Sequence, residues 1–293
     1  PELIGRDATG VHVWTFQPAD ETCSLDRPAC GSWAPFAQPL VADFADANGF
    51  GGDASRTIKA ADIDGDGHAE IVGMGSNGLT AVRWDGRSFG LVQQYPELKT
   101  SDRNGIDSIR VGEVDGKAGE EILVRRSDGL HVYTYDKDRG FSQQGLLTDF
   151  ADGTDVGRNE HHWRTTMLVD FAGTGHKAVT ANTSDGLKVW WYGTGGAWNA
   201  LPSLDEATAT KTQASYKKPE VYRGLLPVPH AERNGPWGVL LRDVDTRIAG
   251  INVYSFVNGQ PDTSCGATCW GGRAYDGDAA AALTGPDVNA AVT

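Results

Sequence analysis

Four carboxylates in one short segment have the types and spacing of a loop that binds a divalent cation. The segment "DIDGDGHAE" places Asp62, Asp64 and Asp66 at alternate positions and ends at Glu70, and His68 would add a backbone carbonyl. This is the first part of the oxygen-ligand order of an EF-hand loop, and the intervening glycines allow a sharp turn. Because strand-like sequence flanks the segment, we predict one structural Ca²⁺ site in a strand–loop–strand that joins one repeat to the next. The alternative is a solvated acidic turn without metal.

Sister loops further along the chain depart from this ligand pattern. In "EVDGKAGEE" the third ligand position is Lys117, an ammonium where the cation would lie. In "DFAGTGHKA" the first position keeps Asp170, but the last is Ala178. We therefore predict that these loops are held by hydrogen bonds or by an ion pair of Lys117.

A pattern of short apolar strand, turn and alternating strand recurs along the whole chain, which indicates a repeat architecture. The copies read "ELIGRDATGVHVWTF", "EIVGMGSNGLTAVRW", "EILVRRSDGLHVYTY", "AVTANTSDGLKVWWY" and "GVLLRDVDTRIAGINVYSF". Gly10, Gly78, Gly129 and Gly186 occupy the same turn, where a positive φ is needed. Trp14, Trp190, Tyr133 and Tyr254 alternate with valines, and we expect them to pack between sheets or cover a sheet face.

Each copy continues through a third strand, such as "GLLTDF", and then a loop and a fourth strand, such as "SIRVGEVD". Four antiparallel strands repeated about a ring form the blades of a β-propeller. We therefore predict an all-β fold: one β-propeller domain over residues 1–293 with four-stranded antiparallel blades, five in number, with seven as the alternative. The expected repeat units are approximately 1–69, 70–120, 121–177, 178–237 and 238–293. The segment "LTGPDVNAAVT" at the end resembles the residues before each first strand, so the two chain ends would meet in one blade.

Repeats that end in "DIDGDGHAEIV" resemble the FG-GAP/VCBS repeats of integrin-like β-propellers, secreted bacterial forms included. The resemblance extends over the chain as repeats, but the full motif stands in one loop. It implies that Asp62, Asp64, Asp66 and Glu70 are side-chain ligands of Ca²⁺ and that His68 is a carbonyl ligand.

The charge and the cysteines limit the partners and the compartment. A formal net charge of −13 disfavours nucleic acid and membrane surfaces as partners. The clustered cysteine pairs favour two local disulfides, which imply an oxidising, extracellular compartment. We expect a secreted protein that is a monomer. The alternative is four free thiols in a reducing cytoplasm. The cysteines are Cys23, Cys30, Cys265 and Cys269.

In three of the five repeats arginines stand just past the expected end of the first strand, and we expect them to converge at one mouth of the channel. Arginine's planar fork suits carboxylate or sulfate groups, so this face would bind an acidic glycan or a protein. The alternative is an internal network of salt bridges, since Arg6 and Arg242 each precede an aspartate. The candidate ligand-binding residues are Arg6, Arg125, Arg126, Arg242 and Trp163.

Three functions are compatible with this sequence, and we favour binding over catalysis because no catalytic constellation has a recognisable spacing. The first is a secreted, calcium-stabilised binding module for a glycan or a protein. The second is an enzyme, a lyase of uronate-containing polysaccharides. The third is a secreted propeller that interacts with a protease, from a resemblance in repeat character. A lyase would use His161, His162, Arg164 and Tyr222.

Overall fold

The computed structural model describes most of the first two thirds of the chain and isolated strands after that. The described ranges are 2–19, 31–99, 109–184, 186–193, 196–204, 225–229, 237–242, 251–256 and 270–275. Only the backbone is described for 37–39, 161, 202–204 and the last four strands. The predictions on the four cysteines, on Tyr222 and on the C-terminal segment that would close the ring lie outside these residues.

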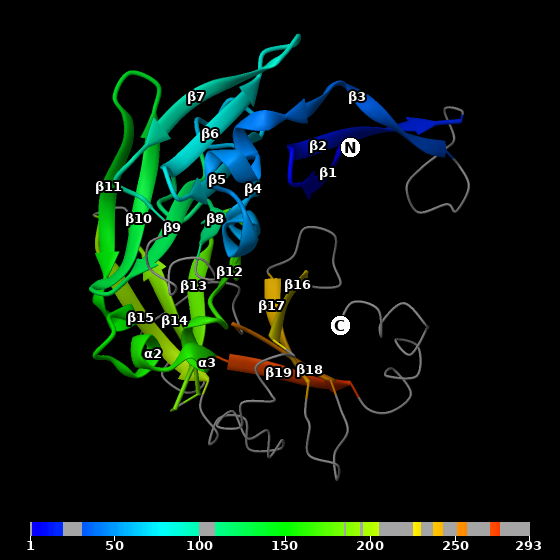
Figure 1. The fold of residues 1–293 in the computed structure, drawn as a ribbon. Helices are drawn as coiled ribbons and strands as arrows, with labels where there is room; N and C mark the ends of the chain where they lie inside the picture. The colour runs from blue at the N-terminus through cyan, green and yellow to red at the C-terminus, as the bar shows by residue number, and fades with distance from the viewer. Residues whose placement is uncertain are drawn as a thin grey trace. The chain divides into compact units, whose positions relative to one another are not determined.

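The fold is all-β and consists of blade-like antiparallel sheets (Figure 1). One sheet has three strands, in the order β1-β2-β3, and four sheets have four strands each: β4-β5-β6-β7, β11-β10-β9-β8, β12-β13-β14-β15 and β16-β17-β18-β19. Contacts group the first two sheets in one unit, Pro1–Asp107, and the other three in a second, Ser108–Thr293. The single propeller domain and its five blades stay predictions.

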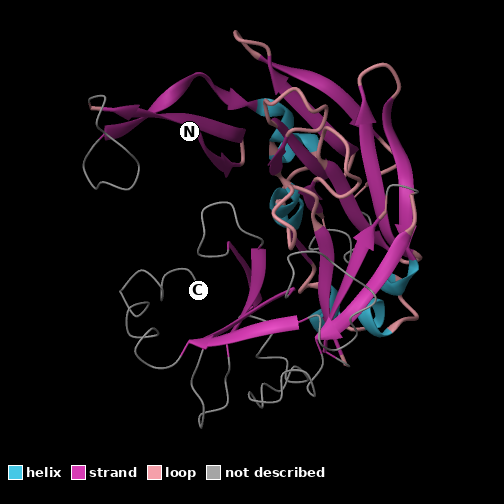
Figure 2. Cartoon of the chain, turned by 180° about the vertical axis from the view of Figure 1, so that it is seen from behind, coloured by secondary structure: helices cyan, strands magenta, loops and turns pink. Residues whose placement is uncertain are grey.

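The strands of the first unit are β1 Glu2–Asp7, β2 Gly10–Pro18, β3 Gly31–Val41, β4 Lys59–Ala61, β5 Glu70–Gly75, β6 Gly78–Trp84 and β7 Phe89–Tyr95. Those of the second are β8 Arg110–Gly112, β9 Glu121–Arg126, β10 Gly129–Asp136, β11 Gly140–Leu147, β12 Met167–Val169, β13 Ala178–Thr183, β14 Gly186–Tyr192, β15 Trp198–Leu204, β16 Leu225–Pro229, β17 Trp237–Arg242, β18 Ile251–Phe256 and β19 Trp270–Tyr275. Short helices lie in the connections (Figure 2): η1 Ala42–Phe44, η2 Asp46–Asn48, η3 Gly52–Thr57, η4 Thr148–Phe150, α2 Asp155–Arg158 and α3 Glu160–Trp163.

Each four-stranded sheet begins one strand earlier than the predicted repeat unit. β4 pairs with β5 in antiparallel register, with Ala61 opposite Glu70. The acidic loop is therefore a hairpin loop inside one sheet, and the prediction that it joins one blade to the next is wrong. The physical reason is that a short glycine-containing loop closes an antiparallel hairpin directly. The connections between sheets are the longer segments, such as the one from β3 to β4.

The hairpins of the repeats, by contrast, form as predicted. Gly10, Gly78, Gly129 and Gly186 have φ values of 143°, 124°, 148° and 122°. In each hairpin the glycine opens the second strand and pairs with the last residue of the first, as Gly78 does with Gly75. Glycine is suited to this position because side chains disfavour positive φ.

The cores lie where sheets and their following turns pack together. In the second unit, Phe150 and Trp190 are buried with ring centroids 5.2 Å apart, and the Trp190 indole N–H donates to Asp149 at 2.8 Å. Because Trp190 belongs to β14 and Phe150 follows β11, this contact joins neighbouring sheets, as expected for that tryptophan. In the first unit, Phe44 and Phe50 are buried in the connection between β3 and β4, with ring centroids 4.9 Å apart. Within the described residues, no helix has the length and apolar character needed to cross a membrane.

The turn glycines provide a test of the hairpin geometry. A Cβ at Gly78 would clash with the Tyr95 carbonyl oxygen and lie 2.7 Å from the Pro96 Cα, at a φ of +124°. We expect Gly78→Ala to lower the free energy of unfolding by at least about 2 kcal/mol, measured by chemical denaturation. Gly90→Ala is the control, because a Cβ at Gly90 meets nothing within 4 Å. Its expected effect is below about 0.5 kcal/mol, and equal effects at both positions would contradict the analysis.

Candidate functional site

The acidic loop brings together three of its four predicted side-chain ligands. One carboxylate oxygen from each of Asp62, Asp64 and Glu70 lies within 4.8 Å of the others. Asp66 is outside this group, and its carboxylate accepts the His68 N–H at 2.8 Å. Asp62 shapes the turn, since its two oxygens accept the backbone N–H groups of Asp66 at 3.1 Å and of Gly67 at 2.9 Å.

Arg83 is a member of this cluster that the sequence interpretation missed. Its Nε donates to the Glu70 Oε1 at 2.7 Å, and its Nη2 pairs with Asp64. Glu70 has no exposed surface, and burial raises the pKa of its carboxyl while the hydrogen bond from Arg83 opposes that rise. A signal existed in the sequence: the hairpin register that places Ile71 opposite Val82 also places Glu70 opposite Arg83.

The sister loop after β8 carries a second carboxylate group, Glu113, Asp115 and Glu121, whose oxygens also lie within 4.8 Å of one another. The predicted ion pair is confirmed, because the Lys117 ammonium lies 2.6 Å from the Asp115 carboxylate. Glu121 accepts the Val114 N–H at 2.7 Å. Burial, with Coulombic repulsion from Asp115 and Glu113, raises the pKa of Glu121 to about 7.

The loop after β12 is held by hydrogen bonds, as predicted. The Asp170 carboxylate accepts the N–H groups of Thr174 at 3.1 Å and of Gly175 at 2.7 Å. These two bonds reproduce the arrangement around Asp62, without the other acidic residues of that loop.

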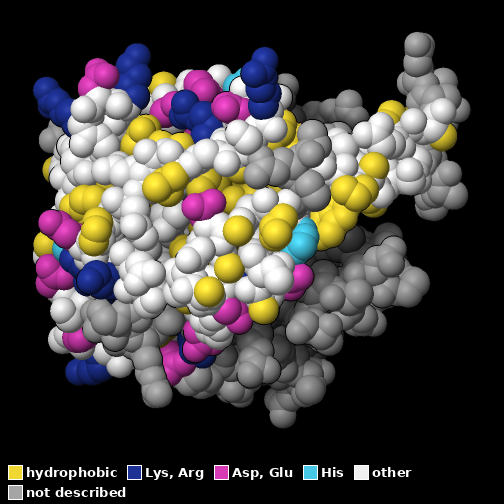
Figure 3. All heavy atoms as spheres, turned by 45° about the horizontal axis from the view of Figure 1, so that its top comes forward, with side chains coloured by type: hydrophobic (Ala, Val, Ile, Leu, Met, Phe, Trp, Pro, Cys, Tyr) yellow, Lys and Arg dark blue, Asp and Glu magenta, His cyan; other side chains and the backbone are white. Residues whose placement is uncertain are grey.

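The candidate arginines lie within strands, not past their ends as expected. Arg125 has no exposed surface, pairs with Asp152, and donates to the carbonyl oxygens of Phe150 at 3.1 Å and Gly157 at 2.9 Å. Arg6 pairs with Asp46 at the equivalent place in the first sheet. These contacts favour the salt-bridge alternative. Arg126 is partly buried, and Arg242 ends β17, where only the backbone is described. On the face shown in Figure 3, Lys and Arg side chains lie among Asp and Glu side chains.

Trp163 and His162 are buried, and the exposed Arg164 lies beside them. Trp163 is 3% exposed, and the guanidinium carbons of Arg125 and Arg164 lie 5.5 and 5.6 Å from its ring centroid. His162 is 4% exposed, with Nδ1 3.0 Å from the Asp155 carbonyl oxygen. Arg164 pairs with Glu160 at 2.6 Å. The His161 side chain and Tyr222 lie outside the described residues, so the assembly of the proposed lyase residues stays a prediction.

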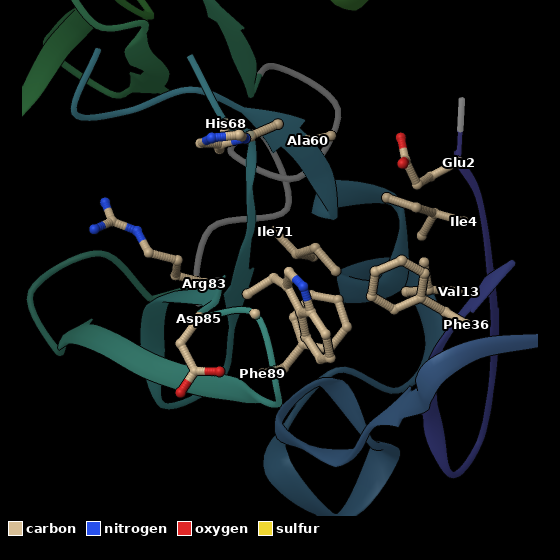
Figure 4. A pocket seen from close by; sticks show the side chains of 13 residues that line it. Glu2, Ile4, Val13, Phe36, Ala60, His68, Ile71, Arg83, Asp85 and Phe89 are labelled. Carbon is tan, nitrogen blue, oxygen red and sulfur yellow. The ribbon is translucent and has the colours of Figure 1, made fainter. Parts of the chain in front are cut away.

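A pocket of about 580 Å³ opens between the sheet β1-β2-β3 and the sheet β4-β5-β6-β7, within the first unit (Figure 4). Its aromatic wall consists of Phe36, Trp84 and Phe89. Ring centroids are 4.7 Å apart for Phe36 and Trp84, and 5.1 Å apart for Trp84 and Phe89. Aliphatic side chains complete the apolar part: Ile4, Val13, Ala60, Ala69 and Ile71.

The polar residues of this pocket connect it to the acidic loop. Glu2, His68, Arg83 and Asp85 line it, with Arg83 and Asp85 on one side of the apolar centre in Figure 4. His68 belongs to the acidic loop, and Arg83 pairs with the carboxylate of Asp64 in the same loop. The sequence interpretation missed the pocket because residues from two sheets form it, and only the aromatics around the "WDGRSF" turn pointed to it.

No family model and no curated protein match this chain. Among solved structures, it is similar to an Agrocybe aegerita lectin described as specifically recognising non-reducing terminal N-acetylglucosamine, with a TM-score of 0.61 and 17% identity. The likeness covers 93% of this chain and 62% of the lectin chain, so this chain spans less than two thirds of that length. A second match is the Photorhabdus luminescens Tc holotoxin pore, with a TM-score of 0.49, 13% identity, and coverage of 94% of this chain and 11% of that one. The lectin likeness supports the fold alone.

The raised pKa of Glu121 predicts a pH dependence of stability. The folded state holds this proton up to about pH 7, whereas an unfolded glutamate releases it near pH 4.3. Its contribution to stability is therefore present at low pH and is lost as the pH rises through about 7. We expect Glu121→Gln, which keeps an acceptor for Val114, to match the original chain near pH 4 and to exceed its free energy of unfolding by about 1–3 kcal/mol at pH 8. Denaturation across this range measures it; a constant difference would contradict the assignment.

Proposed function

We propose that this chain is a glycan-binding module and that its ligand enters the pocket lined by Phe36, Trp84 and Phe89. The observation that carries the proposal is the pocket itself, a concave apolar site with a few polar groups at its edge. Ligand sites in proteins have this composition. Aromatic rings offer the C–H faces of a sugar a flat apolar surface, and the polar residues can receive its hydroxyl groups.

The lectin comparison supports this choice at a coarse level, because that protein is described as recognising non-reducing terminal N-acetylglucosamine. Fold does not determine function, so N-acetylglucosamine serves here as the first probe. The lyase alternative is weaker on the described residues, because His162 is buried and Arg164 is paired with Glu160.

The proposal includes the number of blades, the type of repeat and the cellular compartment. We take the five sheets as the blades of one five-bladed propeller of the FG-GAP/VCBS type, and we place the protein outside the cell with Cys23 paired to Cys30 and Cys265 to Cys269. The repeat pattern and the clustered cysteines of the sequence support these statements.

We further propose that the acidic loop binds one structural Ca²⁺ through Asp62, Asp64, Asp66 and Glu70, with the carbonyl of His68. The donor set fits a hard cation, because it consists of oxygens and three of the carboxylates converge within 4.8 Å. Arg83 is the positive group among them in the structure. Calcium would therefore have to displace this guanidinium from Asp64 and Glu70.

Replacing the central ring of the aromatic wall tests glycan binding. We expect Trp84→Ala to weaken the binding of triacetylchitotriose at least about tenfold, measured by isothermal titration calorimetry. Trp84→Phe keeps an aromatic face and should lose less affinity for triacetylchitotriose than Trp84→Ala. Trp33→Ala is the matched control, since Trp33 is 42% exposed and does not line the pocket. Equal losses in the Trp33 and Trp84 variants would contradict the site, and silence on a glycan array would contradict the function.

Calcium titration tests the metal site. We expect a chelator-treated sample to bind one Ca²⁺ and to gain about 2.7 kcal/mol of stability when free Ca²⁺ exceeds its Kd about 100-fold. Asp62→Asn should abolish both effects, whereas Arg83→Met should tighten calcium binding because the competing guanidinium is gone. Absence of both binding heat and thermal shift in the original chain would exclude the site.

A further inference from the structure

The pocket has an excess of negative charge around it. Glu2 and Asp85 line it directly, and Asp64, Asp66 and Glu70 lie beside Arg83 at distances of 4.0 Å or less. Among the lining residues, all of which are described, Arg83 is the single Lys or Arg. Five carboxylates thus surround one guanidinium, in a chain whose formal net charge is −13.

Arg83 is held away from a ligand by its carboxylate partners. Its Nε donates to Glu70 at 2.7 Å, and its Nη2 pairs with Asp64. Because Glu70 is completely buried, turning the guanidinium toward a ligand would leave a buried carboxylate without its cation, which strongly destabilises a fold. A sugar carboxylate in the pocket would therefore gain little from Arg83.

Asp85 contributes a fixed negative charge at the edge. Its Oδ1 accepts the backbone N–H groups of Arg87 and Ser88, both at 2.8 Å, and these bonds lower the pKa of its carboxyl. The residue is exposed. The turn therefore presents an ionised carboxylate beside the aromatic wall at neutral pH.

We propose that this pocket, while Arg83 is paired with the acidic loop and no calcium competes for it, selects hexosamine sugars that are uncharged or carry an ammonium group, and that it rejects uronates and other acidic sugars. The inference rests on the proposed glycan function and names the class of sugar. The apolar wall accommodates a pyranose face or an acetamido methyl group, and the carboxylates at the edge accept N–H and O–H groups. An acidic sugar would meet carboxylates whose nearest cation is already paired, which disfavours its binding electrostatically. The acidic glycan expected from the sequence was assigned to the arginines of another surface.

Calorimetry with three trisaccharides in calcium-free buffer tests this selectivity. We expect triacetylchitotriose and its fully deacetylated, cationic form to bind, and trigalacturonate to bind at least about tenfold more weakly than either. Raising the salt concentration should weaken the binding of the cationic trisaccharide and leave the binding of the acetylated one nearly unchanged. If trigalacturonate binds as tightly as the hexosamines, the selectivity is overturned while the glycan function stands. If none of the three binds, both are overturned.

A single charge change separates electrostatic selection from shape. Asp85→Asn keeps an oxygen for the turn, and we expect it to weaken the cationic trisaccharide roughly two- to fivefold while changing the acetylated one less than about twofold. Asp53→Asn removes an exposed carboxylate that does not line the pocket, so it should change neither. Equal effects of Asp85→Asn on both sugars, or no effect on either, would overturn the role of this charge in the selection.

Discussion

A buried carboxylate needs a proton or a cation beside it, and in the first unit that requirement is met across one hairpin. Glu70 opens β5 with no exposed surface, and Arg83 near the end of β6 supplies the positive charge. The same guanidinium reaches Asp64 and so attaches the acidic loop to β6. Four residues that follow Arg83 form one side of the pocket: Trp84, Asp85, Gly86 and Phe89. The attachment of the loop to β6, next to this side of the pocket, thus depends on one guanidinium.

Comparison of the sister loops separates the shape of this turn from its charge. Asp62 and Asp170 each accept two backbone N–H groups, at positions four and five residues on. The position of Glu70 is taken by Glu121 in the next sheet and by Ala178 in the one after it. The hydrogen bonds of the first aspartate therefore suffice to form the turn, and the buried carboxylate is an addition that brings a demand for a cation. In the second copy, the cation beside the acidic cluster is Lys117, which pairs with Asp115.

Local rules predicted the parts of the structure that depend on neighbouring residues. Alternation of valines predicted the hairpin strands, and the recurring glycines predicted the turns, because both signals act over a few residues. The predicted boundary between sheets was wrong by one strand. The sequence does not show that the strands on either side of the acidic loop pair with each other, so the loop was predicted to be a connection between sheets. Arg83 was hidden in a different strand from the acidic run, and the pocket needed two sheets to be placed side by side. The pairing of Arg125 with Asp152 could not be predicted, because the two residues are 27 positions apart and nothing in the sequence shows that they lie side by side.

The arginine–aspartate pairs have an implication for how such a chain grows. Arg6 with Asp46, and Arg125 with Asp152, each join a strand to the turn that follows the last strand of its own sheet. Each turn also returns a backbone N–H to its own hairpin, from Asp46 to Ala8 at 3.0 Å and from Asp152 to Ser127 at 2.8 Å. A duplicated stretch of gene would therefore encode both partners of this ion pair and of this backbone hydrogen bond. Copies of this kind can diverge in their loops, as long as a copy that gains a buried carboxylate also supplies its cation, as the hairpin of Glu70 does with Arg83.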